Sequence, residues 1–233
     1  MAIHYNPKIV TDGLVLYLDS VNTKSYPGSG NIWYDLSGRG NDATATPVSS
    51  TSDTPGTVIS LDASGLITCN LAVQVDKYSF TLSYWGRPVA TPDSNYQPIF
   101  SVIDSVNPHG YYFIGDTREV AAPYVLHYVK DFTVSDWDTR QMVNTAVYST
   151  YVWNYYTLVV YAENDWRSYL DGVHLGNNTT PSQDLSGYGN VTSVTLGGTS
   201  CNFNICSVAL YDRELTQVEI EQNFNASRGR FGL

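Results

Sequence analysis

The sequence predicts an all-β protein, an antiparallel β-sandwich of the jelly-roll type with one short helix near its C-terminus. Short apolar runs, separated by Gly, Pro, Asn and Asp, recur along most of the 233 residues and are typical of many short strands. Aromatic residues make up 13% of the chain and charged residues only 15%, a balance that favours half-buried sheets with polar outer faces. One segment has a well-specified helix start. Together these observations exclude a helical bundle and a disordered chain.

The strands follow one another along the chain. The first is expected at 13–20, where leucine occupies every second position from 14 to 18. Later apolar runs predict strands at 58–61, 78–85, 98–103, 111–115, 124–128, 155–161, 167–170, 193–196 and 205–211. Asp171-Gly172 predicts a tight hairpin, because glycine supplies the positive φ of a primed turn. Between 91 and 154, Pro, Asn, Asp and Ser interrupt the pattern, so long loops are expected there.

The helix is expected directly after the last strand. Thr216 can cap its N-terminus with Glu219 at the third helical position, which makes a capping box. Leu215 and Ile220 can close a hydrophobic staple over this start. The charged tetrad at 211–214 precedes the cap; its acidic residues suit the helix dipole, and its arginine is expected to pair locally. The side chains expected to dock on the sheet, at helical spacing, are Val218, Ile220 and Phe224.

The chain length fits one domain. A single β-sandwich of this size can bury a sizeable core, and no composition shift marks a boundary. The jelly-roll domain is expected at 13–224, with residues 1–12 as an N-terminal arm and 225–233 as a C-terminal tail.

Charge and composition exclude several classes of partner. The formal net charge is −10 without any cluster of Lys or Arg, which excludes the electrostatic footprint of a nucleic-acid-binding protein. The first residues lack the basic and apolar regions of a signal peptide, and no apolar run is long enough to cross a bilayer. Synthesis in a cytoplasm, without membrane attachment, is therefore expected. The cysteines are odd in number and form no zinc pattern, so buried free thiols are expected at Cys69, Cys201 and Cys206.

The segment Asp-Leu-Ser-Gly-x-Gly-Asn occurs twice, at 35–41 and at 184–190, without matching flanks. Its preferred interpretation is a turn used twice, with two glycines for a tight backbone and an Asp that caps nearby amides. A shared cation site is the alternative, since carboxylate and amide oxygens suit a hard cation. The candidate metal ligands of these two segments are Asp35, Asn41, Asp184 and Asn190.

Several blocks, in one order along nearly the whole chain, resemble the concanavalin A-like (laminin G-like) jelly-roll domains. They are 13–19, 33–41, 80–85, 153–161, 169–173 and 210–216. The segment 25–30 and the C-terminal residues 223–232 resemble the form of this domain found in structural proteins of tailed phages and algal viruses. The resemblance implies a lectin-like sandwich. The loop that holds adjacent acidic residues in the family reads 61–66 here and keeps only Asp62, a weak calcium site, so no cofactor is expected.

Catalytic chemistry is not expected. Glycosidases on the same jelly roll carry Glu-x-Asp-x-x-Glu on one strand, and their carboxylates flank the scissile bond. The nearest match, Glu163 and Asp165, has Ser168 in place of the second glutamate. It also lies between two predicted strands, where a polar hairpin end is the preferred interpretation. The four histidines are dispersed, and no serine has the setting of a nucleophile. The sequence therefore predicts a protein that is not an enzyme.

A carbohydrate site would need exposed aromatic rings beside Asp or Asn side chains. Two predicted loops offer this combination. The candidate carbohydrate-binding residues are Trp137 with Asp136 and Asp138, and Tyr96 with Asp93 and Asn95. Trp33, Trp85 and Trp153 lie in or beside apolar strand patterns and are expected to fill the sandwich core.

The preferred interpretation is a non-enzymatic virion structural protein, either a capsid decoration (cement) protein or a tail-associated module. The phage-like blocks, the missing export signal and the missing carboxylate pair favour it. Its expected partners are other virion proteins and copies of itself, with neither nucleic acid nor membrane, and its expected location is the virion. The alternative is a carbohydrate-binding adhesin that recognises host-surface polysaccharide. A glucanase-like hydrolase is a third, less favoured reading.

Overall fold

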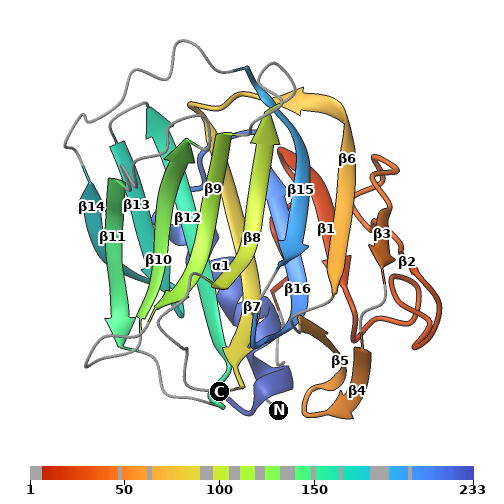
Figure 1. Cartoon of the computed structure of the whole chain (residues 1–233). Coiled ribbons are helices and arrows are strands. Elements are labelled where there is room, and N and C mark those ends of the chain that lie inside the picture. The colour runs from red at the N-terminus through yellow and green to blue at the C-terminus, as the bar shows by residue number, and fades with distance from the viewer. Residues whose placement is uncertain are drawn as a thin grey trace.

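The computed structural model describes residues 7–46, 49–61, 65–89, 97–104, 111–118, 124–131, 140–147, 151–162, 165–178, 189–198 and 201–233. It also describes the side chains of these residues, except for those within 97–98, 102–147 and 178. Within these residues, sixteen strands form two antiparallel sheets of eight that pack face to face (Figure 1). The predicted all-β sandwich of the jelly-roll type, with its short C-terminal helix, is confirmed.

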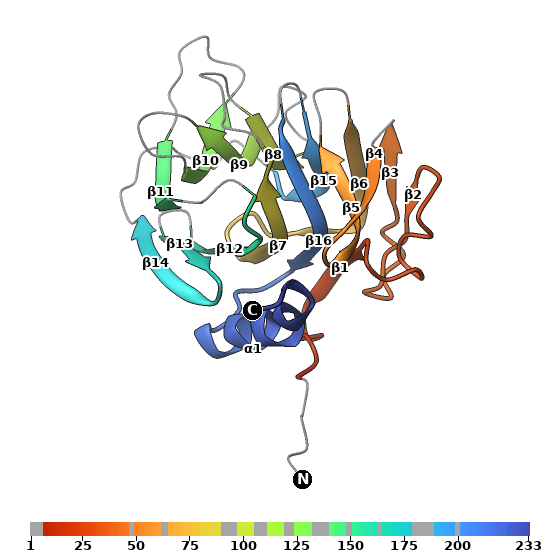
Figure 2. The same cartoon turned by 90° about the horizontal axis from the view of Figure 1, so that it is seen from below.

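Sheet A carries the helix. Its strands, in spatial order, are β14 (Val173–Asn178), β13 (Asp165–Leu170), β12 (Asn154–Ala162), β7 (Phe80–Pro88), β16 (Phe203–Tyr211), β5 (Gly56–Leu61) and β4 (Ser49–Asp53), and β1 (Leu14–Asp19) also pairs with β16. Sheet B contains β11 (Arg140–Val147), β10 (Tyr124–Asp131), β9 (Tyr111–Arg118), β8 (Gln97–Asp104), β15 (Val191–Gly197), β6 (Leu66–Val75), β3 (Ala43–Thr46) and β2 (Ile32–Trp33). The helix α1 (Gln217–Ser227) lies on the side of sheet A that faces away from sheet B (Figure 2).

Every strand expected from the sequence is present, with ends that differ by at most three residues. The hairpin is also confirmed, because Leu170 pairs with Val173 across Asp171 (φ 51°) and Gly172 (φ 81°). Four short or polar strands, β2, β3, β4 and β11, were not predicted, and neither was the ten-residue β6. The apolar side chains of β6 do not all face the core, since Leu66 is 39% and Val73 65% exposed. The strand therefore lacks a regular alternation of apolar and polar residues.

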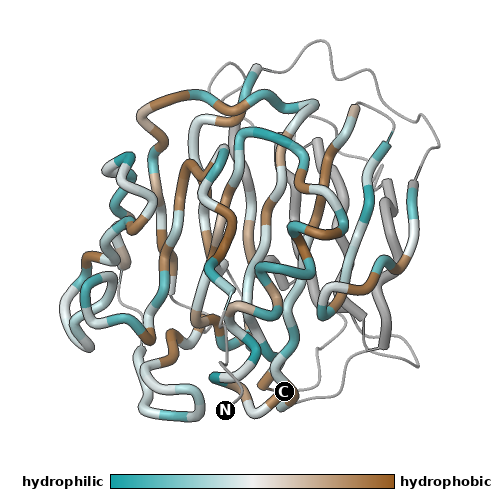
Figure 3. Tube along the Cα trace, turned by 180° about the vertical axis from the view of Figure 1, so that it is seen from behind, coloured by the Kyte–Doolittle hydropathy of each residue, from teal (hydrophilic) through white to brown (hydrophobic). Residues whose placement is uncertain are grey.

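The sandwich interior is filled by every second residue of the central strands. On β7, Phe80, Leu82 and Tyr84 belong to this interior core, together with residues of sheet B. Figure 3 shows that apolar residues recur along the strands. The neighbouring Trp85 faces the other way and belongs to a cluster under the helix. Since both faces of sheet A are covered, β7 is buried at nearly every position.

The three tryptophans expected in the sandwich core are all buried, but for two of them the expected location is wrong. Trp33 is 1% exposed and lies in the interior core. Trp85 and Trp153 lie instead on the outer face of sheet A, where Phe231 stacks on Trp85 with 3.9 Å between the ring centroids. Strand parity explains the difference, because Tyr84 already occupies the inward position next to Trp85.

The helix begins as predicted. Thr216 accepts a hydrogen bond from the amide of Glu219, the Glu219 carboxylate accepts one from the Thr216 amide at 2.8 Å, and the capping box is complete. Leu215 and Ile220 are fully buried in the same cluster, as the staple requires. The prediction that Val218 docks on the sheet is wrong, since its side chain is 71% exposed. The buried face is formed by Ile220, Asn223 and Ser227.

Both ends of the described chain pack against this helix. Val10, in the expected N-terminal arm, is buried and its amide donates to Asn223 at 2.8 Å. In the expected tail at 225–233, α1 continues to Ser227 and a 3₁₀ turn, η1 (Arg228–Phe231), follows. Arg230 of this turn pairs with the buried carboxylate of Asp19 at 2.6 Å. Through Phe231, which stacks on Trp85, and Arg230, this turn packs on the outer face of sheet A.

Neither described helix is long and apolar enough to span a bilayer. The three cysteines are buried and unbridged, as predicted.

Candidate functional site

A pocket of about 280 Å³ lies where two distinctive blocks of the sequence meet. One side is the turn that contains Gly38, Arg39 and Asn41, from the first Asp-Leu-Ser-Gly-x-Gly-Asn segment. The opposite side is the end of β6, residues 72–75, and Asp212 of the charged tetrad completes the lining. The two blocks are far apart in the sequence, and β1 and β16, which precede them, pair with each other.

Asp35 builds the turn, in agreement with the preferred interpretation of this segment. Its Oδ1 accepts hydrogen bonds from the amides of Tyr17 and Ser37, both at 2.9 Å. Its Oδ2 accepts from the Ser37 hydroxyl at 2.6 Å and from the Asn41 amide at 3.1 Å. Gly38 takes a φ of 84° that residues with a Cβ rarely adopt. The carboxylate therefore fixes the turn to β1 and presents Arg39 at its tip.

Asn41 forms part of the buried floor of the pocket. The side chain is 2% exposed and joins two strands, because its amide nitrogen donates to the Val15 carbonyl and its oxygen accepts from the Ala72 amide, both at 2.8 Å. Val15 is itself 4% exposed. The end of β6 is thereby held beside β1, and the pocket has a buried, partly apolar floor.

Asp212 is held at the mouth by the backbone. Its amide donates to the Gly13 carbonyl at 2.9 Å. Gly13 has a φ of 73°, and a Cβ there would lie 2.9 Å from both Asp212 Oδ1 and Arg213 Cγ, so the close approach requires glycine. Arg213 pairs with Glu219 at 2.6 Å and with Asp12 at 2.9 Å, which confirms the expected local pairing.

Three polar side chains of the pocket are unengaged. Arg39, Gln74 and Asp212 are exposed, and within the described part of the chain their side chains make no hydrogen bond or ion pair. Arg39 can only donate, Asp212 can accept at two oxygens, and Gln74 can do both. Beside them Val73 offers an apolar surface that is 65% exposed. A concave site with an apolar floor and a few convergent polar groups is the usual form of a small-molecule site.

The side chains of this set can donate and accept hydrogen bonds to a ligand. Asp212 supplies the one carboxylate among the described residues that line the pocket, whereas glycoside hydrolysis uses a pair. Asp165, from the nearest match to the glycosidase pattern, is engaged elsewhere: it pairs with Arg167 at 2.7 Å where β13 starts. Glu163 lies outside the described residues.

The site residues predicted from the sequence fall mostly outside the described part of the chain. This holds for the carbohydrate candidates Asp93, Asn95, Tyr96, Asp136, Trp137 and Asp138 and for the metal candidates Asp62 and Asp184. Asn190 is described and exposed, and Asp35 and Asn41 meet in the turn, where hydrogen bonds engage their oxygens. Among the described residues, no group of three His, Cys, Asp or Glu could hold a metal ion. Both sets of site residues stay predictions.

The sequence offered a partial signal for the pocket. Its two motifs are visible in the sequence, which assigns Arg39 to a turn and Asp212 to the start of a helix. Gln74 could not be placed, because β6 was not predicted. The convergence of the three side chains depends on strand pairing between β1 and β16, which no local pattern encodes.

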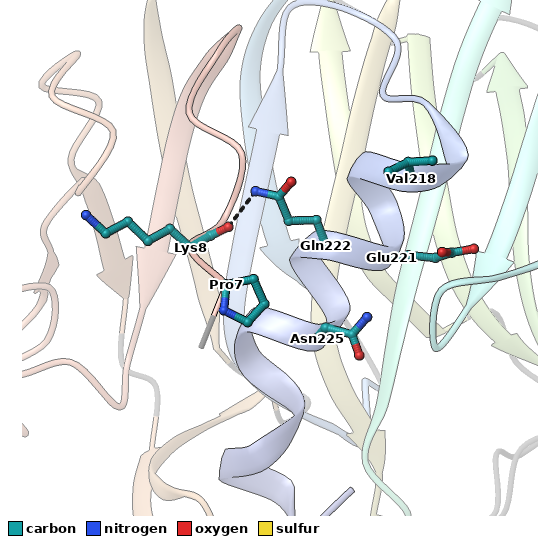
Figure 4. A pocket seen from close by; sticks show the side chains of 6 residues that line it. All are labelled: Pro7, Lys8, Val218, Glu221, Gln222 and Asn225. Atoms are coloured by element: carbon teal, nitrogen blue, oxygen red, sulfur yellow. Dashed lines mark hydrogen bonds between the residues drawn. The ribbon is translucent and has the colours of Figure 1, made fainter. Parts of the chain in front are cut away.

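A second hollow, of about 430 Å³, lies on the surface between the N-terminal arm and α1 (Figure 4). Pro7 and Lys8 line one side, and Val218, Glu221, Gln222 and Asn225 line the other. Gln222 donates to the Lys8 carbonyl at 2.7 Å, while the Lys8 side chain extends away from the helix (Figure 4). In this hollow the N-terminal arm lies against α1.

Solved structures with the same fold include three that differ in kind. Trypanosoma rangeli sialidase in complex with sialic acid is 17% identical, with a TM-score of 0.66 over 94% of this chain and 33% of that chain. Botulinum neurotoxin type C, whose uptake into cells depends on interaction with two ganglioside molecules, is 18% identical, with a TM-score of 0.65 over 93% of this chain and 52% of that chain. Domain 4 of an extracellular arabinanase from Geobacillus stearothermophilus, in complex with arabinotriose, is 15% identical, with a TM-score of 0.65 over 90% of this chain and 97% of that chain.

The chain thus spans about a third of the sialidase and about half of the neurotoxin chain. At these identities the likeness shows a shared fold. No curated protein matches the chain in sequence. The family model of the concanavalin A-like lectin/glucanases superfamily matches residues 60–221, which is more than half of the chain. The chain therefore belongs to the concanavalin A-like lectin/glucanase superfamily.

Proposed function

We propose that the chain is a non-enzymatic carbohydrate-binding domain and that its ligand occupies the pocket between the 38–41 turn, the end of β6 and Asp212. The observation that carries the proposal is the set of three unengaged side chains, Arg39, Gln74 and Asp212, beside exposed apolar surface. Domain 4 of the arabinanase, of which this chain covers 97%, is in complex with arabinotriose. It supports the proposal as an example of a domain with this fold that binds a sugar.

The side chains suit a sugar for a physical reason. Each sugar hydroxyl both donates and accepts, so a site needs acceptors and donors close together. Asp212 accepts, Arg39 donates, and charged partners make these hydrogen bonds stronger than neutral ones. The valine at 73 and the alanine at 72 can contact the C–H face of the ring.

A glycan array with the purified chain tests the proposal, followed by titration of the best ligand. We expect saturable binding that Asp212→Ala and Arg39→Ala each weaken roughly tenfold or more, since each removes a hydrogen bond to a charged group. Val218→Ala, an exposed change in the second hollow, is the control and should bind like wild type. Absence of glycan binding by the wild-type chain contradicts the proposal.

A structural role in a virion, as a capsid decoration or tail-associated module, is a second proposal. The phage-like sequence blocks support it, and so does the packing of the N-terminal arm against α1, with an open hollow between them (Figure 4). Copies of the chain and other virion proteins are the proposed partners. Mass spectrometry of purified virions is the test, and absence of the chain from mature particles would rule this role out.

A further inference from the structure

The pocket has a buried floor. Asn41 and Val15 belong to its lining and are 2% and 4% exposed, and Asn41 joins β1 to β6. The volume of about 280 Å³ is slightly below the range of 300 to 1,000 Å³ typical of small-molecule sites. A polysaccharide that binds along its length would need a groove open at two ends. A pocket of about 280 Å³ with a buried floor suits one sugar residue better than a run of several.

The charges around the pocket disfavour an anionic ligand. The lining contains one positive side chain, Arg39, and one negative side chain, Asp212. Two further carboxylates follow directly on lining residues: Asp42 after Asn41 and Asp76 after Val75, both exposed. The whole chain carries a net charge of −10. A sugar carboxylate would gain one guanidinium and face several carboxylates, whereas a neutral sugar meets no such repulsion.

We infer that the pocket binds the neutral terminal residue of a glycan, end-on, with Asp212 and Arg39 as the residues that select it. This inference rests on the proposed function and narrows it to a ligand class. Asp212 accepts hydrogen bonds from the hydroxyls of the terminal ring and repels a carboxylate. Val73 and Ala72 contact the ring's apolar face.

The experiment starts from a neutral glycan that binds on the array and compares three forms of it by calorimetry. The first is the glycan itself, the second carries an added neutral sugar on the terminal residue, and the third carries an added sialic or uronic acid there. We expect both capped forms to bind at least about tenfold more weakly, because a pocket of this volume leaves no room for a second residue. Attachment of the glycan to a support through its reducing end should leave the affinity unchanged.

Two matched variants test the role of charge. Asp212→Asn keeps the shape of the side chain but removes its charge. It should weaken binding of the neutral glycan roughly tenfold, because a charge-assisted hydrogen bond is lost. Asp76→Asn removes a carboxylate beside the pocket and outside its lining, and it should bind like wild type. Thermal melting confirms that both variants are folded.

The outcomes separate the inference from the proposed function. If the wild-type chain binds no glycan on the array, both are overturned. If it binds glycans but prefers anionic termini, tolerates either cap, or is unaffected by Asp212→Asn, the inference is overturned and the chain remains a carbohydrate-binding protein.

Discussion

Asn223 joins three separate parts of the molecule, and its removal should be costly. Its Oδ1 accepts from the Val10 amide at 2.8 Å, and its Nδ2 donates to the Tyr211 hydroxyl at 3.0 Å. The Tyr211 hydroxyl in turn donates to the Val10 carbonyl at 3.1 Å. The arm, the last strand and the helix thus share one buried hydrogen-bond network. Burial raises the pKa of Tyr211 well above its ordinary value, so the hydroxyl stays neutral and keeps donating.

The change Asn223→Ala removes the acceptor of one buried amide and one donor to a buried hydroxyl. The Val10 amide would be left as an unsatisfied buried donor, which costs about 1–3 kcal/mol. The Tyr211 hydroxyl would lose one hydrogen bond but keep the one it donates to Val10, so its loss adds only about 0.5–1.5 kcal/mol. We expect the free energy of unfolding to fall by about 2–4 kcal/mol. For a domain of this size that corresponds to a loss of roughly 5–15 °C in Tm.

Urea unfolding of wild type and Asn223→Ala measures the effect. Asn225→Ala is the matched control, because Asn225 lies on the same helix but is exposed, and its loss should cost less than about 0.5 kcal/mol. Limited trypsin digestion gives a second measurement, since release of the arm would expose the bond after Lys8. A loss below about 1 kcal/mol, with no faster cleavage there, would refute the reasoning that this network holds the arm.

Two other predictions concern the ends of the same helix. Hydrogen bonds from Arg213 are the largest cause that lowers the pKa of Glu219 from 4.5 to about 2, so this carboxylate stabilises the fold above pH 4.5 and the contribution is lost as the pH falls towards 2. Since the pair is partly exposed, Glu219→Gln should cost about 1 kcal/mol at pH 7 and almost nothing near pH 2, as urea titrations at both pH values will show. Phe231→Ala removes the ring stacked on Trp85 and should cost about 1.5–3 kcal/mol with a red shift of tryptophan emission; an unchanged spectrum and stability would mean that the C-terminal turn does not cover this ring.

The start of the helix could be predicted because its signal is local. Thr216 and Glu219 lie three residues apart and satisfy each other without help from the rest of the fold. The docking face could not be predicted in the same way. Asn223 and Ser227 are polar and yet buried, because their partners Val10, Tyr211 and Trp85 lie far away in the sequence. Val218 is apolar, so the sequence pattern assigns it to the face that contacts the sheet, although its side chain is exposed.

The direction of the side chains on β7 could not be predicted, because both faces of sheet A are covered. A strand with one solvent-exposed face alternates between apolar and polar residues, and the sequence then shows which residues face the core. On β7, Tyr84 faces the interior core and Trp85 faces the helix, so adjacent aromatic residues are both buried. The apolar run identifies the strand correctly but cannot say which side each ring faces. The same tertiary information is needed to bring Arg39, Gln74 and Asp212 to one pocket.

The block that contains Asp212 and Glu219 links the fold to the proposed site. Arg213 is fixed by Glu219 of the capping box and by Asp12, and both Arg213 and Asp212 pack against Gly13. The helix start therefore helps to hold the carboxylate at the mouth of the pocket. Glu219→Gln should consequently lower both stability and glycan affinity, whereas Asn223→Ala lowers stability through a network that does not include the pocket. If both variants lose glycan affinity in proportion to their lost stability, the pocket depends on the whole sandwich. If Glu219→Gln lowers glycan affinity and Asn223→Ala does not, the capping box positions Asp212.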